Sequence, residues 1–300
     1  MKSYQRLLAF LALMLLLTSL LSPWAAALWQ WLTEVRPEWQ EYRFPFSNFF
    51  NRIFIALGIL LFAFYPSLLE IHSPRQLGLS SFRRGYRDLI KGFFLALASV
   101  IALIFAMSLV GIFTPYLRLS LTATSERIFT ALLAAIAAGF LEEIFFRGIL
   151  LKGLLEDWKP TIALAVVSLF YSAIHFVKPE EKIFLTGIDP WAGFKHLAGI
   201  FQPFLDSIDL LPGIFGLFLI GIALGHAPMR RGSLYLSIGL HAGWVFGLKT
   251  SRVYGDYRRE ELGWLFGSSD PKLVSGVATW VSIAVVIVVV HLITRKPTKP

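Results

Sequence analysis

Runs of about 17 or more residues with few charges recur along the chain, and they restrict its fold more than any other feature. They lie near residues 7–29, 53–69, 92–113, 128–155, 161–177, 212–228, 234–248 and 273–293. Only 16% of the 300 residues are charged, compared with about 25% in average soluble proteins. In lipid a backbone must satisfy its hydrogen bonds internally, and these runs lack the alternation of strands. The sequence therefore predicts an all-α, polytopic membrane protein with about eight transmembrane helices.

The first run has two possible fates. Lys2 and Arg6 precede an uncharged stretch, and Pro23 and a run of alanines follow it, a pattern typical of a signal peptide. The uncharged stretch continues to Trp29, however, so it is long enough to be a membrane anchor. Because many further spans follow, we expect a retained anchor.

Charge and cysteine content exclude several functions. A formal net charge of +9 could indicate a nucleic-acid partner, but the basic residues stand singly or in pairs at the ends of apolar runs. This placement is typical of residues that flank membrane spans. We therefore expect the lipid bilayer, and no nucleic acid, as a partner. The chain has no cysteine, which excludes disulfides, thiolate catalysis and zinc–thiolate sites.

Lysine and arginine in the connecting loops predict the orientation in the membrane. The loop between the second and third spans is the most basic and contains Arg75, Arg83, Arg84, Arg87 and Lys91. Together with Lys2, Arg6 and the basic tail, this loop places both termini in the cytoplasm.

The chain divides into three segments. Residues 1–127 contain three N-terminal spans, residues 128–248 form a catalytic core, and residues 249–300 contain an external loop, the last span and a basic tail. The longest stretch outside the spans, 178–211, mixes prolines and glycines with apolar residues. It could be an interfacial or re-entrant segment that closes over a site, or a plain external loop.

The apolar run 128–155 contains two adjacent acidic residues and, four residues after the second, an arginine. A charged side chain near the centre of a membrane helix costs roughly 2.5–3.5 kcal/mol, and such residues are usually paired and functional. Glu143 and Arg147 are four residues apart on one helix face, where they can form an ion pair. Glu142 lies about 100° away around the helix, which favours it as a general base or proton carrier. The three residues could instead form a packing network without chemistry.

Two later spans each carry a histidine among small residues, which permit close helix approach. These are His175 and His241. Measured from the cytoplasmic helix ends, Glu142 and His175 lie roughly 20 Å deep and His241 roughly 10 Å. His241 therefore needs a tilt or a later helix start to join the other two.

The remaining histidines lie at span ends or in the external loop, and we assign them no role. They are His72, His196, His226 and His291. His226 is the strongest exception, because it lies on a core helix near Arg230 and Arg231.

One acid and two histidines allow two kinds of site. They could hold a zinc ion that keeps an open position for water. Alternatively, Glu142 could activate water directly while the histidines orient it and stabilise the oxyanion. The chain has no His-Glu-x-x-His run, and spacing alone does not decide between the two.

The order of these residues resembles the CAAX-protease and bacteriocin-processing family of intramembrane endopeptidases. The resemblance rests on Glu142-Glu143-x-x-x-Arg147, on an aromatic-x-x-x-His motif that ends at His175, and on a third motif that begins at His241. It covers about residues 128–248, with four core helices. It implies an endopeptidase similar to CAAX prenyl protease 2, which cleaves a membrane-associated protein or peptide in a bacterial plasma membrane.

The resemblance also implies a role for each matching residue. Glu142 would be the general base, His175 would help to hold the water, and His241 would contribute to the oxyanion site. Glu143, Arg147 and Tyr171 would support them. This mechanism needs no metal, so we expect no cofactor; zinc at Glu142, His175 and His241 is the less favoured alternative.

Two positions depart from the family pattern. Tyr171 replaces a phenylalanine four residues before the second-motif histidine and keeps the aromatic ring. Val245 replaces an asparagine or aspartate four residues after His241 and cannot donate a hydrogen bond. Loss of one oxyanion donor costs about 10²–10³ in rate. Either another donor substitutes, with Trp244 and Ser237 as the nearest polar candidates, or the protein is slow or inactive.

Two other functions are compatible with the sequence. The chain could be a catalytically inactive membrane partner or immunity protein of the same fold. It could also be a proton-coupled transporter that uses Glu142 and the histidines as a relay. Against the transporter, the sequence has no detectable repeat of its halves, which many transporters show.

Overall fold

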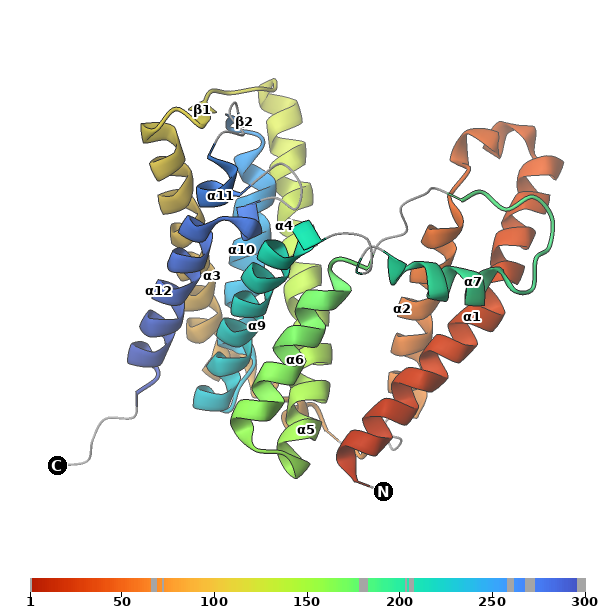
Figure 1. Ribbon diagram of the computed structural model, residues 1–300, viewed down its shortest axis with the longest axis horizontal. Helices are drawn as coiled ribbons and strands as arrows, with labels where there is room; N and C mark the ends of the chain where they lie inside the picture. Colours follow the sequence, from red (N-terminus) through yellow and green to blue (C-terminus); the bar gives the residue numbers. More distant parts are fainter. Residues whose placement is uncertain are drawn as a thin grey trace. The chain divides into compact units, whose positions relative to one another are not determined.

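The computed structural model of the chain is almost entirely helical (Figure 1). The structure describes residues 2–65, 69–71, 73–177, 183–202, 204, 208–257, 262–267 and 273–295. His72 and most of the basic tail, residues 296–300, lie outside the described residues.

The chain folds into two compact units, each made of two stretches of sequence. One unit comprises Met1–His72 and His175–Ile208, and the other comprises Ser73–Ile174 and Asp209–Pro300. The second unit holds most of the predicted core and also the third predicted span.

In the first unit, the long helix α1 packs against α2 and α7. The helices are α1 (Ser3–Val35), α2 (Phe46–Phe64) and α7 (Ala192–Gly199). Gly193 lets α7 approach α1 closely, since a Cβ there would lie 2.0 Å from the Ser19 carbonyl oxygen. His196 packs against Phe46 and Phe50, with ring centroids 5.4 and 4.8 Å away. Burial lowers the pKa of His196, so its ring is neutral near pH 7 and packs as an aromatic group.

Helix α7 belongs to the stretch 178–211, for which the sequence left two readings open. Residues 178–182, 203 and 205–207 of this stretch lie outside the described residues. The described part packs α7 onto α1. Closure of the stretch over a site stays a prediction.

The second unit is a helix bundle with a short two-stranded sheet at one end. Its helices are α3 (Phe82–Leu109), α4 (Leu121–Glu143), α5 (Lys152–Asp157), α6 (Pro160–Ile174), α9 (Leu211–Arg231), α10 (Tyr235–Ser251), α11 (Gly263–Phe266) and α12 (Val277–Ile293). Strands β1 (Phe113–Pro115) and β2 (Gly255–Tyr257) pair antiparallel, with Phe113 opposite Tyr257. An ion pair of 2.9 Å between Arg118 and Asp256 ties the same two loops together.

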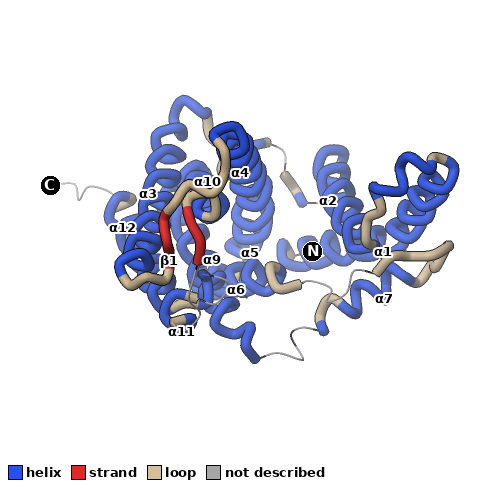
Figure 2. Tube along the Cα trace, turned by 90° about the horizontal axis from the view of Figure 1, so that it is seen from above, coloured by secondary structure: helices blue, strands red, loops and turns tan. Residues whose placement is uncertain are grey.

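Helix α10 forms the centre of this bundle and packs against α3, α4 and α9 (Figure 2). Most of its residues are buried. Glycines make this possible: a Cβ on Gly243 would lie 2.3 Å from the Phe93 carbonyl oxygen of α3. On the other side, a Cβ on Gly139 of α4 would lie 2.9 Å from the Ile238 carbonyl oxygen. Small residues thus bring α3 and α4 within backbone contact of α10.

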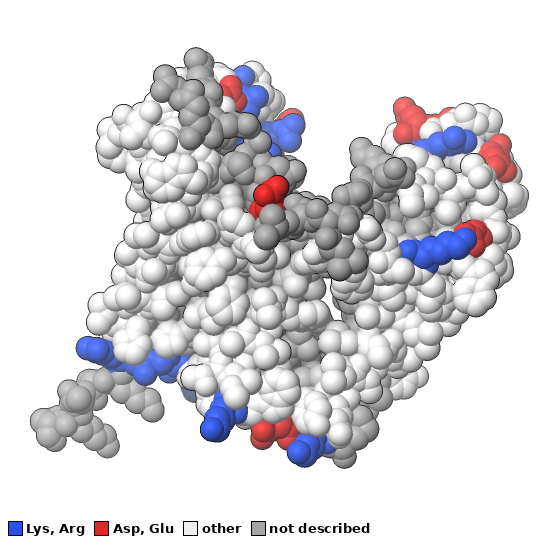
Figure 3. Space-filling view, in the orientation of Figure 1, with Lys and Arg blue, Asp and Glu red and all other residues white. Residues whose placement is uncertain are grey.

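Four helical segments are long and apolar enough to cross a membrane: Ser3–Val35, Pro74–Leu109, Leu121–Asp157 and Leu211–Arg231. Shorter apolar helices cover Phe46–Phe62, Pro160–Ile174 and Val277–Ile293. Charged side chains on the visible face of the second unit lie toward the ends of its helices (Figure 3). The all-α, polytopic membrane class is confirmed.

The predicted count of eight spans is not confirmed, although each predicted run contains a helix. Helices α6, α10 and α12 have only 15, 17 and 17 residues. Helix α6 is shorter than the roughly 17 residues that a span needs, and α10 and α12 lie at that lower limit.

Candidate active site

The acidic pair lies where the helix changes its hydrogen-bonding pattern. Helix α4 ends at Glu143, and Ile144–Leu151 continues in the same direction as a π-helix. The wider turn of a π-helix rotates later side chains relative to an α-helix, and such turns occur frequently at functional sites. All residues from Phe146 to Leu151 are buried in the bundle. The sequence predicted a regular helix here, because no residue pattern distinguishes the π turn.

The predicted ion pair between Glu143 and Arg147 is present. Arg147 Nη1 lies 2.9 Å from Glu143 Oε1, and neither side chain is exposed. Arg147 Nη2 also donates to the Gly221 carbonyl of α9, at 3.3 Å. The guanidinium carbon lies 4.6 Å from the centroid of the Tyr171 ring. An aromatic face is what this cation contacts, so tyrosine can serve where the family pattern has phenylalanine.

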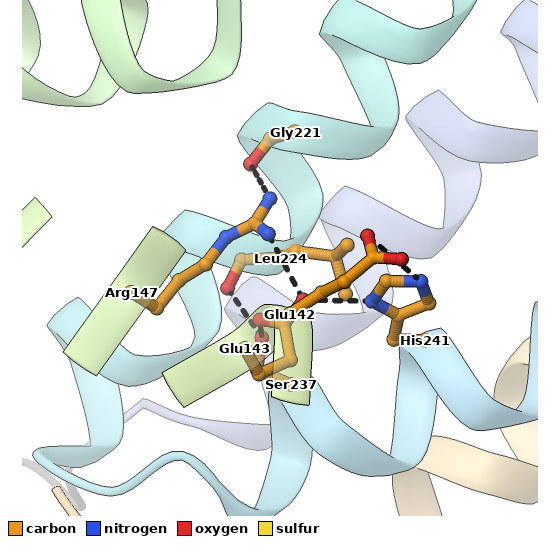
Figure 4. Close-up of polar contacts among 7 residues, drawn as sticks. All are labelled: Glu142, Glu143, Arg147, Gly221, Leu224, Ser237 and His241. Atoms are coloured by element: carbon orange, nitrogen blue, oxygen red, sulfur yellow. Dashed lines mark hydrogen bonds and ion pairs between the residues drawn. The ribbon is translucent and has the colours of Figure 1, made fainter. Parts of the chain in front are cut away.

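Glu143 makes further contacts with α10 that sequence reasoning missed (Figure 4). His241 Nδ1 lies 2.9 Å from Glu143 Oε1, and the Ser237 hydroxyl contacts Glu143 Oε2. Ser237 Oγ also lies 2.8 Å from the Leu224 carbonyl of α9. One buried carboxylate therefore links α4, α9 and α10. A signal was available, because Ser237 and His241 are four residues apart and share a helix face.

Glu142 approaches the same imidazole from its other nitrogen. Glu142 Oε2 lies 3.8 Å from His241 Nε2. The Glu142 side chain is 35% exposed, whereas that of His241 is 5% exposed. The His241 ring thus lies between two carboxylates: Glu143 is fully buried, whereas Glu142 is partly exposed and turns its buried Oε2 atom toward the ring. The pairing of Glu142 with His241 agrees with the predicted site, although the catalytic roles stay predictions.

His175 directly follows α6, which ends at Ile174, and it belongs to the other compact unit. Its position beside Glu142 therefore stays a prediction. Among the described residues, no three His, Asp and Glu side chains gather in a way that could hold a metal ion. The predicted absence of a cofactor and the less favoured zinc alternative, with Glu142, His175 and His241 as ligands, both stay untested.

The two candidate substitutes for the missing oxyanion donor at Val245 both have partners elsewhere. Trp244 Nε1 donates to Ser99 Oγ of α3 at 3.0 Å. The Ser237 hydroxyl lies between Glu143 and the Leu224 carbonyl. Neither group is directed at the space between Glu142 and His241.

A comparison with protein families identifies the bundle core. Residues 124–247 match the Rce1-like family, described as type II CAAX prenyl endopeptidase Rce1-like. Over these residues, the chain is similar to the Rce1-like family. The match includes every residue that carried the resemblance found in the sequence, which is thereby confirmed. Comparisons with curated proteins and with solved structures gave no match.

The match to the Rce1-like family supports a CAAX-type intramembrane protease. Such an enzyme acts on a protein or peptide in a membrane environment. Together with the apolar helices, this makes the chain an integral membrane protein.

Proposed function

We propose that the chain is an intramembrane endopeptidase that hydrolyses a membrane-associated protein or peptide with a water activated by Glu142. The observation that carries this proposal is the 3.8 Å separation between Glu142 Oε2 and His241 Nε2. A water about 2.8 Å from each atom fits this separation. The partly exposed carboxylate of Glu142 and the imidazole held by Glu143 would then contact the same nucleophile.

The hydrogen bond to Glu143 assigns the protons of His241. Glu143 is ionised, because it is paired with Arg147, so it accepts a hydrogen bond from His241 Nδ1. In the neutral ring, Nε2 is then an acceptor. We therefore place His241 on the water, whereas the oxyanion role implied by the family resemblance would need a second proton on the ring.

The chemical step follows from these contacts. Glu142 takes a proton from the water, and the hydroxide forms a bond with the carbonyl carbon of the scissile peptide. Glu142 then returns the proton to the amide nitrogen as the C–N bond breaks. His175 would help to hold the water, as the family motif implies. This mechanism routes no step through a metal.

We further propose a bacterial plasma membrane as the location, with both termini in the cytoplasm. The sequence predicted Arg83, Arg84 and Arg87 in a loop, whereas the structure places them in the first turns of α3; as basic residues at a span end, they support this orientation. Protease accessibility of tags at each terminus in inside-out vesicles tests it.

The Glu142→Gln variant should lose about 10²–10⁴ in hydrolysis rate, because glutamine cannot accept the proton from water. The measurement uses proteoliposomes and a farnesylated peptide that ends in a CAAX sequence and carries a fluorophore and a quencher. A peptide without the farnesyl group tests whether the lipid is needed.

Glu126→Gln is the matched control, since Glu126 is an exposed acid on the same helix α4. It should leave the rate unchanged. Equal rates for wild type and Glu142→Gln would refute the proposed mechanism.

A catalytically inactive partner or immunity protein is the second candidate, favoured by Val245 and by the engaged Trp244 and Ser237 donors. The Val245→Asn variant separates the two candidates. In an enzyme that lacks one oxyanion donor, the added amide should raise the hydrolysis rate by up to about 10²–10³. In an inactive protein, neither Val245→Asn nor Glu142→Gln should change the phenotype.

A further inference from the structure

The first three turns of α3 carry four exposed basic side chains, which form the α3 basic cluster: Arg83, Arg84, Arg87 and Lys91. Asp88 is the one acidic residue of α3, and it pairs with Arg231 of α9 at 2.9 Å. Among the residues that the structure describes, no acidic side chain forms an ion pair with the cluster. The cluster is therefore a concentration of positive charge that this part of the chain does not neutralise.

The charges of the α3 basic cluster repel one another along the helix. Arg83, Arg87 and Lys91 follow at intervals of four residues, so they are neighbours on one helix face. Arg84 lies three residues before Arg87, which is also a neighbouring position. Like charges at these spacings destabilise a helix. A bound anion would remove this repulsion, because it interacts favourably with all four side chains at once.

The face of α3 that carries the cluster continues as an exposed apolar surface. Its residues farther along the helix are Phe94, Ile101 and Phe105. At 3.6 residues per turn, these side chains lie on the same face as Arg83 and Arg87. The buried Gly85 and Gly92 lie on the opposite face, against α10. In a membrane the exposed apolar face contacts acyl chains, so the basic cluster at its end lies at the level of the lipid headgroups.

Two aromatic side chains flank the cluster. Phe82 and Tyr86 are 64% and 37% exposed, and their ring centroids are 6.4 Å apart. The guanidinium carbon of Arg87 lies 5.8 Å from the Tyr86 centroid, and Arg87 Nε donates to the Tyr86 hydroxyl at 3.2 Å. Exposed tyrosines of membrane proteins are enriched at the boundary between lipid and water. This pair therefore supports a lipid headgroup, rather than a soluble anion, as the partner of the cluster.

We propose that the α3 basic cluster binds the phosphate of an anionic phospholipid whose acyl chains lie along the apolar face of α3. Guanidinium groups bind phosphate oxygens through paired hydrogen bonds, and a lysine adds a point charge. Basic clusters next to a membrane span attract anionic lipids. Because α3 packs against α10, a lipid bound to α3 also stabilises the bundle. The site lies outside residues 124–247, which match the protease family, and is separate from the acid–histidine site.

The test is a titration of the purified full-length protein in detergent with phosphatidylglycerol, followed by native mass spectrometry and by thermal unfolding. We expect saturable binding and a rise in Tm, and neither response to phosphatidylcholine, whose headgroup has no net charge. The double variant Arg83→Gln/Arg87→Gln should bind phosphatidylglycerol about 30-fold more weakly, since each basic residue near a lipid surface strengthens binding about fivefold. The Tm without lipid reports whether the variant folds.

Arg127→Gln/Lys249→Gln is the matched control, because it removes two exposed positive charges from α4 and α10. It should bind the lipid as wild type does. The proposal is wrong if phosphatidylcholine acts like phosphatidylglycerol, if the folded α3 variant keeps wild-type affinity, or if the control loses as much affinity. An equal rise in Tm with glycerol phosphate, which has no acyl chains, would assign the cluster to a soluble phosphate and would also overturn it. Since the readout is binding, its result does not depend on protease activity.

Discussion

The Arg147→Met variant should lose about 3–5 kcal/mol of unfolding free energy, because it leaves the fully buried carboxylate of Glu143 without its cation. Methionine fills a similar volume and can pack beside Tyr171, so lost volume contributes little. Denaturant unfolding of the purified protein in detergent measures the change. Hydrolysis should also fall, since Glu143 holds His241 Nδ1.

Arg231→Met is the matched control. Arg231 pairs with Asp88 at 2.9 Å, but the two side chains are 33% and 19% exposed. Partly exposed pairs contribute about 0–1 kcal/mol. If Arg147→Met costs no more than Arg231→Met, the buried pair does not hold the core together. The double variant Glu143→Gln/Arg147→Met should recover much of the stability, because it removes both buried charges.

Local features of the site were predictable from the sequence. Glu143 and Arg147 are four residues apart on one helix, so their ion pair depends on helix geometry alone. The sequence also predicted that Tyr171 preserves the aromatic ring of the family's phenylalanine. In the structure, the Arg147 guanidinium contacts the face of this ring. The apolar runs similarly predicted the helices, because lipid excludes other backbone structures.

The contacts of His241 were less predictable, because they depend on where helices cross. Depth along the helices placed His241 about 10 Å from the level of Glu142, yet the two side chains face each other at 3.8 Å. The depth of a residue along its own helix does not predict the point at which a neighbouring helix crosses it. The crossing depends on glycines such as Gly139, whose contact with α10 is long-range in sequence.

Two further features had no sequence signal. The π-helix Ile144–Leu151 has the same apolar composition as an α-helix. Helix α3 belongs to the core bundle, because its backbone contacts α10 closely. The sequence resemblance began only near residue 128, so it gave no reason to include α3 in the core.

Two glycines of α10, Gly243 and Gly247, should differ in how much stability is lost when each is replaced by alanine. In Gly243→Ala, the new Cβ would lie 2.3 Å from the Phe93 carbonyl oxygen, a backbone atom that cannot move alone. In Gly247→Ala, the Cβ would lie 3.1 Å from the nearest atom of the Val100 side chain. The first substitution must therefore separate α3 from α10, while the second requires Val100 to move by only a few tenths of an ångström.

We expect Gly243→Ala to cost about 1–3 kcal/mol or more and to lower hydrolysis strongly. His241 lies two residues away on the same helix, so a shift of α10 moves Nε2 away from Glu142. Gly247→Ala should be nearly neutral, because alanine gains up to about 1 kcal/mol over glycine in a helix and offsets the tight contact. Tm in detergent and the hydrolysis rate measure both variants. Equal losses in the two variants would mean that the approach of α3 to α10 at Gly243 does not position the histidine.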